Sequence, residues 1–244
     1  MIYELNKCPV CGSTKLNQKS KINNGEDIII KYQCLSCDSI VSNDSYLVEE
    51  RETNIATTIY KNALKSVVEI TADFSAVSTN GTGILLKDNY VLTNAHILSV
   101  DDEIADNIYA SFNGDLSDYN MDIISIDNDL DIALLKIENL KYNPILLENV
   151  KAQTGEKIYA VGNAIGQGLS IVEGIVSDAC REVNGNNYIM HTAPVNHGNS
   201  GGPLYNNKGQ VIGMIVSSRK DAKSMSYAIS NKVILGFLGE LINR

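Results

Sequence analysis

Four of the five cysteines stand in two C-x-x-C pairs close to the N-terminus. Cys8 and Cys11 form the first pair, Cys34 and Cys37 form the second, and 22 residues separate Cys11 from Cys34. Four thiolates suit tetrahedral zinc, and two spaced pairs are more specific for a metal than for redox or chance pairing. With all four ligands supplied by the protein, no position stays open for a water. We therefore expect one structural zinc that carries out no hydrolysis.

Three further segments contain a histidine, an aspartate and a serine, the residue types of nucleophilic catalysis. They run from Thr93 to His96, from Asp131 to Lys136 and from Gly198 to Pro203. Taken singly, each is ambiguous, because a histidine can be a structural core residue and an aspartate can cap a strand. Long stretches of chain separate the three segments. They could act together only in a fold that brings them into one cleft.

Short β-rich runs between turn signals fill the chain from residue 66 onward and indicate an all-β unit. Because little helix separates them, they favour barrels or a sandwich over βαβ units. The predicted strands are Val67 to Thr71, Gly83 to Lys87, Tyr90 to Thr93, Ile108 to Phe112, Ile123 to Ile126, Ala133 to Ile137, Lys157 to Gly162, Leu169 to Ser177, Ile189 to Thr192, Val211 to Ser217 and Ser226 to Ile229. Ser230 could cap a C-terminal helix whose apolar residues follow a helical period.

The first 45 residues form a separate pattern. Cys8-Pro9-Val10-Cys11-Gly12 resembles the first knuckle of a zinc ribbon. Between the cysteine pairs, Asn24-Gly25 is a hairpin signal and Ile28 to Gln33 favours a strand. A unit of about 40 residues buries too little apolar surface to fold without a stabilising metal ion. The charged run from Glu49 to Glu52 then precedes a helical pattern that begins near Ile55.

In their order on an all-β chain, the three segments are similar to the His, Asp and Ser segments of trypsin-like serine proteases. The sequences are Thr93-Asn94-Ala95-His96, Asp131-Ile132-Ala133-Leu134-Leu135-Lys136 and Gly198-Asn199-Ser200-Gly201-Gly202-Pro203. The resemblance covers roughly residues 60 to 235 and is to the HtrA/DegP branch. It implies an all-β fold of two six-stranded antiparallel β-barrels with a C-terminal helix, here preceded by the small zinc ribbon.

The same resemblance assigns a role to each segment. Ser200 would be the nucleophile, His96 the base that takes its proton, and Asp131 the group that orients His96. Asp129 is an alternative to Asp131 but fits the segment less well. Glycines around Ser200 would point the backbone N–H groups of Gly198 and Ser200 at a developing oxyanion.

These expectations divide the chain as follows. The predicted parts are a zinc ribbon over 1–45, a linker and helix over 46–65, and a protease domain over 66–244, with barrel one about 66–148, barrel two about 149–229 and the C-terminal helix about 230–243.

The expected substrate pocket follows from the resemblance. Pro194 would form its floor, with Val216, Ser217 and Ser218 as one wall. No acidic residue lies at that floor, and burying a basic side chain without a partner costs several kcal/mol. We therefore expect cleavage after small or medium apolar residues.

Several positions depart from the family pattern. Asn199 replaces the aspartate that pairs with a newly cut N-terminus in zymogens, so activation by that insertion is not expected. His197 stands where the HtrA-like pattern usually has Pro, and it could line the cleft or face solvent. His191 ends a predicted strand and is expected to be structural. Cys180 is expected to be a buried, inert thiol. A PDZ domain, usual after this domain in HtrA-like proteins, is not expected.

Composition limits the partners. The chain has 244 residues, 44% of them apolar, and a formal net charge of −9. Residues 1–45 carry five lysines and five acidic residues, so the excess negative charge falls on the remaining chain. Nucleic acid is not expected as a partner because its phosphates require a basic face. The N-terminus has no apolar leader segment, and the reduced cysteines suit the cytosol, so we expect a cytoplasmic protein without a membrane contact.

Together these patterns predict an intracellular serine endopeptidase that acts through an acyl-enzyme on protein or peptide substrates. The zinc ribbon would be a docking or regulatory module for a protein partner. The alternative is an inactive or dormant protease-fold binding protein whose ribbon recruits a partner.

Overall fold

The structure, a computed structural model, describes residues 7–8, 11–23, 28–42, 55–101, 103–112, 118–138, 143–216 and 225–242. The chain divides into two compact units, Met1–Asn54 and Ile55–Arg244. The predicted turn at Asn24-Gly25, the charged run 49–52 and the predicted pocket residues Ser217 and Ser218 lie outside the described residues.

The first unit contains a three-stranded antiparallel sheet in the order β1-β2-β3. Its strands are β1 (Leu16–Asn23), β2 (Ile28–Cys34) and β3 (Ile40–Ser42). Alternate residues of β2 face a small core, in which Ile30 and Tyr32 pack against Val41 and Leu16. Small units with a core of this size are commonly stabilised by a metal ion.

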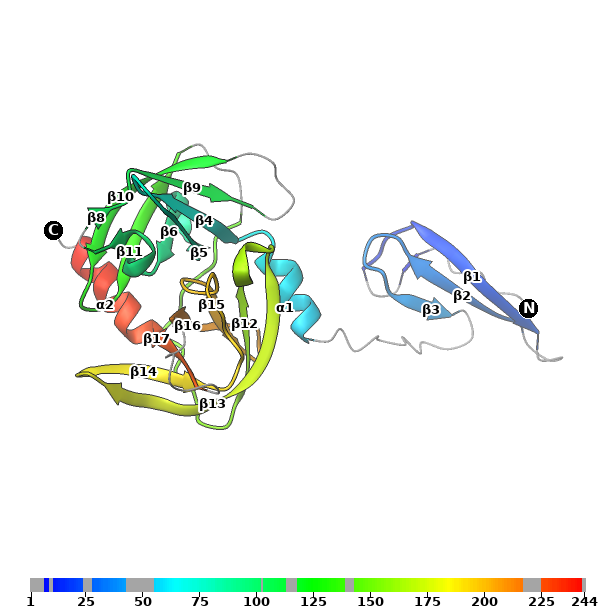
Figure 1. Ribbon diagram of the computed structural model, residues 1–244. Coiled ribbons are helices and arrows are strands. Elements are labelled where there is room, and N and C mark those ends of the chain that lie inside the picture. The colour runs from blue at the N-terminus through cyan, green and yellow to red at the C-terminus, as the bar shows by residue number, and fades with distance from the viewer. Residues whose placement is uncertain are drawn as a thin grey trace. The chain divides into compact units, whose positions relative to one another are not determined.

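Barrel one of the second unit is closed by six antiparallel strands in the order β10-β11-β6-β5-β4-β9 (Figure 1). The strands are β4 (Val67–Asp73), β5 (Ser78–Leu85), β6 (Tyr90–Thr93), β9 (Asn107–Ser111), β10 (Tyr119–Asp127) and β11 (Ile132–Ile137), with a short β7 (Ser99–Val100) and β8 (Glu103–Ile104) pair beside them. Burial alternates along β4 as a strand requires: Val68, Ile70 and Ala72 lie in the barrel core, whereas Glu69 and Thr71 lie between them on the other face.

Barrel two is also closed, in the order β12-β13-β14-β17-β16-β15. Its strands are β12 (Lys157–Gly162), β13 (Ser170–Val183), β14 (Asn186–His191), β15 (Pro203–Asn206), β16 (Val211–Val216) and β17 (Ser226–Ser230). Strands β13 and β14 form a long hairpin, visible at the bottom of Figure 1. The predicted all-β fold with two six-stranded barrels is therefore confirmed.

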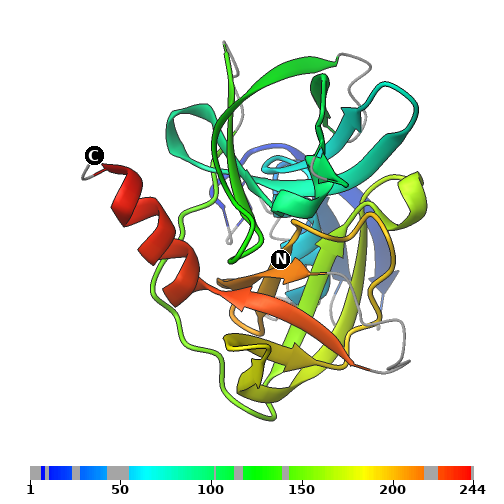
Figure 2. The same cartoon turned by 60° about the vertical axis from the view of Figure 1, so that its left-hand side comes forward.

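Two helices flank the barrels, α1 (Ile55–Ala63) and α2 (Asn231–Ile242). Helix α2 follows β17 and is the red helix at the left of Figure 2. Its Ile234 and Phe237 pack into a core that also contains Leu92 of barrel one and Met214 of barrel two. The C-terminal helix therefore helps to join the two barrels, in addition to covering the second one.

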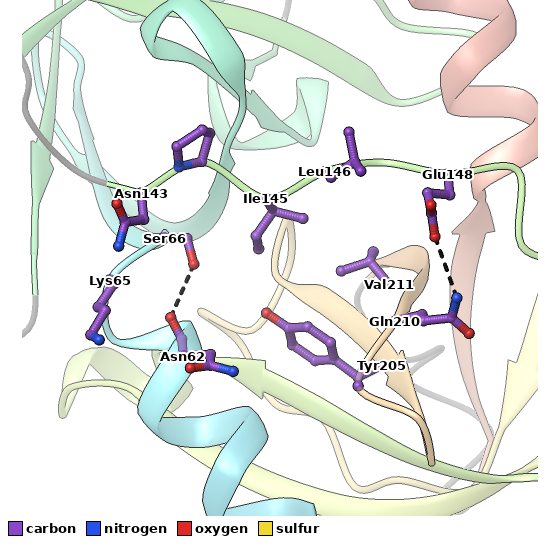
Figure 3. Close-up of a pocket in the computed structure, with 12 residues that line it drawn as sticks. Asn62, Lys65, Ser66, Asn143, Ile145, Leu146, Glu148, Tyr205, Gln210 and Val211 are labelled. Atoms are coloured by element: carbon purple, nitrogen blue, oxygen red, sulfur yellow. Dashed lines mark hydrogen bonds between the residues drawn. The ribbon is translucent and has the colours of Figure 1, made fainter. Parts of the chain in front are cut away.

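The segment between the barrels passes in extended form from Asn143 to Glu148 (Figure 3). Ile145 packs against the core clusters on both sides of this segment. A cavity of about 380 Å³ lies beside it, with Tyr205 on one wall. At the right of Figure 3, the side chain of Gln210 donates a hydrogen bond to the Glu148 carboxylate, 3.3 Å away.

Three local expectations differ from the structure. Strand β15 was not predicted, because it follows directly on the Gly201-Gly202-Pro203 turn signal. The strand predicted as Gly83 to Lys87 begins earlier, at Ser78, and ends before a turn in which Asp88 has φ +58°. The expectation of a buried Cys180 is wrong: it lies exposed in the long hairpin strand β13, beyond the part that the barrel core covers.

None of the helices in the described ranges is long and apolar enough to cross a membrane.

The structural role expected for His191 predicts an acid-sensitive barrel. His191 is fully buried, and this burial lowers its pKa to about 4 although a backbone hydrogen bond with Tyr227 acts in the opposite direction. The unfolded chain therefore binds more protons below pH 6.5, and stability falls as pH falls from about 6.5 towards 4. We expect this side chain alone to cost about 2 kcal/mol of unfolding free energy between pH 7 and pH 5.

Urea unfolding of the unmodified protein and of His191→Leu, each at pH 7 and pH 5, measures this loss of unfolding free energy. The loss of stability at pH 5 should shrink by about that amount in the variant. An equal loss in both proteins would show that His191 does not cause it.

Candidate active site

His96 and Asp131 meet in barrel one. His96 lies in a short 3₁₀ turn directly after β6, and Asp131 lies in the turn that leads into β11, the strand that pairs with β6. The Asp131 Oδ2 atom is 2.8 Å from His96 Nδ1, and its Oδ1 atom accepts the His96 backbone N–H at 3.0 Å. A carboxylate that accepts from Nδ1 leaves Nε2 as the nitrogen that can take a proton.

The turn that carries Asp131 is itself held in place. Asp131 has φ +55°, and its carbonyl accepts a hydrogen bond from the buried Asn94 side chain at 2.9 Å. The alternative carboxylate, Asp129, makes no hydrogen bond to His96 among the described residues, and its carbonyl accepts instead from Asn186. Of the two aspartates, the geometry therefore joins Asp131 to the imidazole.

Ser200 lies in a tight turn of barrel two that requires glycine on both sides of the Asn199-Ser200 pair. Gly198 and Gly201 have φ +93° and +84°. A Cβ atom at Gly198 would lie 2.1 Å from the Asn163 carbonyl oxygen, and one at Gly201 would lie 2.0 Å from the Thr82 carbonyl oxygen. The glycines are needed both for their backbone conformation and for this close approach.

Thr82 of β5 binds this turn to barrel one. Its N–H donates to the Ser200 carbonyl at 2.8 Å, and its hydroxyl donates to the Gly198 carbonyl at 2.6 Å. The same hydroxyl accepts the N–H of Asn163 at 3.0 Å. Thr82 is fully buried, so the three bonds are shielded from water. One threonine thus holds two segments of barrel two.

The backbone N–H groups beside Ser200 differ in their partners. Those of Asn199, Gly201 and Gly202 donate to carbonyls within barrel two. Those of Gly198 and Ser200 have no acceptor among the described residues. These two unpaired donors are the groups that the sequence pattern assigned to an oxyanion hole.

The orientation of the Gly198 N–H is set by the segment 163–168. The Ile165 N–H donates to the His197 carbonyl at 2.8 Å. In a trans peptide the carbonyl of one residue and the N–H of the next point in opposite directions. The bond therefore turns the Gly198 N–H away from Ile165. Ile165 has φ +60°, a strained conformation for a β-branched residue.

A cavity of about 460 Å³ contains the reactive groups. His96, Ser200, Gly198 and His197 all line it, and Ile165 forms part of its wall. His197 is exposed and therefore both faces solvent and lines the cleft. No hydrogen bond joins the Ser200 hydroxyl to His96 within the described residues. Such bonds are often long in proteases without substrate.

The predicted substrate pocket is only partly described. Pro194 is exposed and Val216 is half-buried, and neither lines the cavity that contains His96 and Ser200. Ser217 and Ser218 lie outside the described residues. His191, predicted to be structural, is buried at the end of β14.

The four predicted metal ligands lie together in the first unit. The sulfur atoms of Cys8, Cys11, Cys34 and Cys37 all lie within 4.8 Å of one another. The Cys8 to Cys37 distance is 3.7 Å and the Cys11 to Cys34 distance is 3.6 Å. A zinc tetrahedron with bonds of about 2.3 Å has sulfur separations of about 3.8 Å. Hydrogen bonding with the side chain and backbone of Ser39 lowers the pKa of Cys37 to about 6. The donor set fits zinc.

Three residues of the site escaped the sequence reasoning: Thr82, Asn163 and Glu69. The flanking Gly81 and Gly83 gave no signal for Thr82, because a Cβ at these positions would meet Ile97 and Val91 of the same barrel. Nothing in the sequence shows that Glu69 contacts Asn163, because they are distant in the chain and belong to different barrels.

Comparisons with known proteins agree with this geometry. The model of the trypsin-like peptidase domain matches residues 81–214. Serine protease HTRA1 of Xenopus tropicalis is 36% identical over 171 residues, which cover 66% of this chain and 34% of that protein. A probable periplasmic serine endoprotease DegP-like of Pseudomonas putida is 34% identical over 170 residues, with the same coverage of both chains. The chain therefore spans about a third of the length of these curated relatives.

Among solved structures, the active form of the Rv3671c protease from M. tuberculosis has a similar fold. The TM-score is 0.69 at 22% sequence identity, and the match covers 78% of this chain and 86% of that one. At this identity the likeness concerns the fold alone.

The bridging role of Thr82 can be tested by Thr82→Val, which keeps the shape of the side chain and removes its hydroxyl. The Gly198 carbonyl and the Asn163 N–H would each lose a buried partner, at about 1–3 kcal/mol apiece. We expect the unfolding free energy to fall by about 3 kcal/mol in urea titrations. Thr71→Val removes a hydroxyl that donates one exposed hydrogen bond, of 3.3 Å, to the Asn80 side chain, and this variant should have little effect. Equal midpoints for the two variants would contradict the bridging role.

Proposed function

Because the chain belongs to the trypsin-like peptidase family, we propose that it is a serine endopeptidase with the catalytic residues Ser200, His96 and Asp131. The observation that carries the proposal is the 2.8 Å contact between His96 Nδ1 and Asp131 Oδ2, on the wall of a cavity that Ser200 also lines. HtrA-type and DegP-like serine proteases among the relatives support the same activity.

The proposed reaction proceeds through an acyl-enzyme. Ser200 Oγ attacks the carbonyl carbon of the scissile peptide while its proton passes to Nε2 of His96. The charge that develops on the carbonyl oxygen is stabilised by the N–H groups of Gly198 and Ser200. Collapse of this intermediate breaks the C–N bond, and the leaving amine takes the proton from His96. A water then attacks the ester by the same route and releases Ser200.

Asp131 contributes orientation and charge. By accepting from Nδ1 it keeps the Nε2 lone pair available for the serine proton, and it stabilises the imidazolium that forms during attack. Its second bond, to the His96 backbone N–H, restricts the rotation of the carboxylate.

The substrate preference remains as the sequence predicts. We propose cleavage after small or medium apolar residues, with Pro194, Val216, Ser217 and Ser218 around the side chain that precedes the cut. The support is the absence of an acidic residue from this set, since a buried basic side chain would lack a partner.

We propose that the four cysteines bind one structural zinc and that the first unit docks a protein partner or substrate. The sulfur separations support a tetrahedral ion, and four protein ligands would hold it closed to water. Reduced thiolates of this kind favour a cytoplasmic location. A DegP-like relative is named as periplasmic, so the cysteines are the observation that supports the cytoplasmic location.

The alternative function, from the sequence, is that of an inactive or dormant protease-fold binding protein. In that case the ribbon would recruit a partner and no peptide bond would be cut.

Labelling with a fluorophosphonate probe separates the two functions. The intact, zinc-loaded protein should be labelled and Ser200→Ala should not, because the probe bonds to an activated serine hydroxyl. Asp131→Asn should lower kcat by about 10⁴ with the fold retained, since the imidazole then takes the wrong tautomer. A folded protein that takes no label at Ser200, with candidate partners added, would reject the protease function.

Zinc analysis and a cysteine variant test the proposed ribbon. Protein purified without chelator should contain about one zinc per chain, and Cys34→Ser should lose it, because three thiolates bind the ion less tightly. If the ribbon docks substrates, this variant should hydrolyse a short peptide at the normal rate and cleave a protein substrate more slowly. Cys180→Ser removes the remaining thiol and is the matched control. Zinc-free wild-type protein, or equal loss on both substrates in Cys34→Ser, would contradict these roles.

A further inference from the structure

Glu69 is a carboxylate of barrel one that faces the loops around Ser200. Its neighbours in β4, Val68 and Ile70, lie in the barrel core, so its side chain points outward. The register of β4 and β5 pairs Glu69 with Thr82, the residue that binds the Gly198 carbonyl. Cross-strand partners present their side chains on the same face of a sheet. Glu69 and Thr82 therefore face the same part of barrel two.

The partner of Glu69 is the side chain of Asn163, which donates to its carboxylate through Nδ2. The orientation of this amide is fixed independently, because its Oδ1 accepts the Gly168 N–H at 2.8 Å. Asn163 is 5% exposed, so both bonds are largely shielded from water. Glu69 and Gly168 thus hold the two ends of one buried amide.

Asn163 in turn supports the peptide that precedes Gly198. It begins the segment in which Ile165 donates to the His197 carbonyl, and its own carbonyl lies against Gly198, where a Cβ would approach to 2.1 Å. A rotation of the Asn163 side chain would release Gly168 and loosen Ile165 from His197. The Gly198 N–H would then lose the orientation that an oxyanion requires.

Glu69 has no ion-pair partner among the described residues, and partial burial raises its pKa. Burying a carboxylate without a cation is unfavourable, so packing alone would favour an apolar residue at this position. The presence of a carboxylate at position 69 is explained by its role as the hydrogen-bond acceptor of the Asn163 side chain.

We propose that Glu69 is a positioning residue for the oxyanion hole, acting through Asn163 on the Ile165 to His197 bond. The inference rests on the proposed protease function, because only there does the Gly198 N–H have a task. Glu69 itself does not touch the substrate.

The test compares Glu69→Ala with Glu69→Gln, whose side-chain oxygen can still accept from Asn163. In Glu69→Ala we expect kcat to fall about tenfold with KM nearly unchanged, a part of the 10²–10³ that a lost oxyanion donor costs. Glu69→Gln should restore most of kcat. The fall should vanish in an Asn163→Ala background, because the two residues act through one bond. Glu103→Ala, an exposed glutamate of β8, is the matched control.

A second measurement does not depend on catalysis. Amide hydrogen exchange at Ile165 should become at least about tenfold faster in Glu69→Ala and stay unchanged in Glu69→Gln and Glu103→Ala. Unchanged exchange, or faster exchange with kcat intact, would overturn the proposal. If the unmodified protein shows no Ser200-dependent labelling, the protease function fails, and exchange at Ile165 still decides whether Glu69 positions this loop.

Discussion

The hydroxyl of Thr82 is the contact on which the candidate site depends. It donates to Gly198 and accepts from Asn163, so one buried atom of barrel one is shared by two segments of barrel two. The Thr82 N–H adds a third bond, to the Ser200 carbonyl. Ser200 comes from barrel two, whereas His96 and Asp131 come from barrel one. A shift between the barrels would therefore separate nucleophile and base, and the bonds of Thr82 oppose that shift.

Around this contact the structure combines tight packing with unpaired polar groups. Glycines at 198 and 201 let the turn approach Asn163 and Thr82 more closely than any side chain would permit. The same turn leaves the N–H groups of Gly198 and Ser200 without acceptors in the described part of the chain. An unpaired donor is unfavourable in a buried turn unless a ligand completes it. The strained backbone of Ile165, beside this turn, also destabilises the fold, and strain of this kind is often found at functional sites.

The two units are stabilised by different means. The barrels bury large apolar clusters and are joined by α2 and by the extended segment around Ile145. Within its described residues the first unit has a small apolar core, and its four sulfur atoms lie at separations that fit a metal tetrahedron. A unit this small would gain most of its stability from a bound ion, whereas a domain of the size of the second unit can rely on its core.

Alternating apolar residues and turn signals indicated an all-β unit, and the helical period after Ser230 indicated the C-terminal helix. The resemblance of three short segments to trypsin-like proteases implied the two barrels, and the two C-x-x-C pairs indicated the cysteine cluster. All these signals are local in the chain. Strand β15 and the start of β5 were missed where glycine and polar residues mask the alternation. The residue types of His96, Asp131 and Ser200 could likewise be identified from their segments. The sequence pattern already favoured Asp131 over Asp129 as the partner of the imidazole. Only the tertiary structure decided that Thr82, Asn163 and Glu69 support the nucleophile's turn. These contacts join residues far apart in the chain, and strand register and barrel closure alone bring them within hydrogen-bond distance.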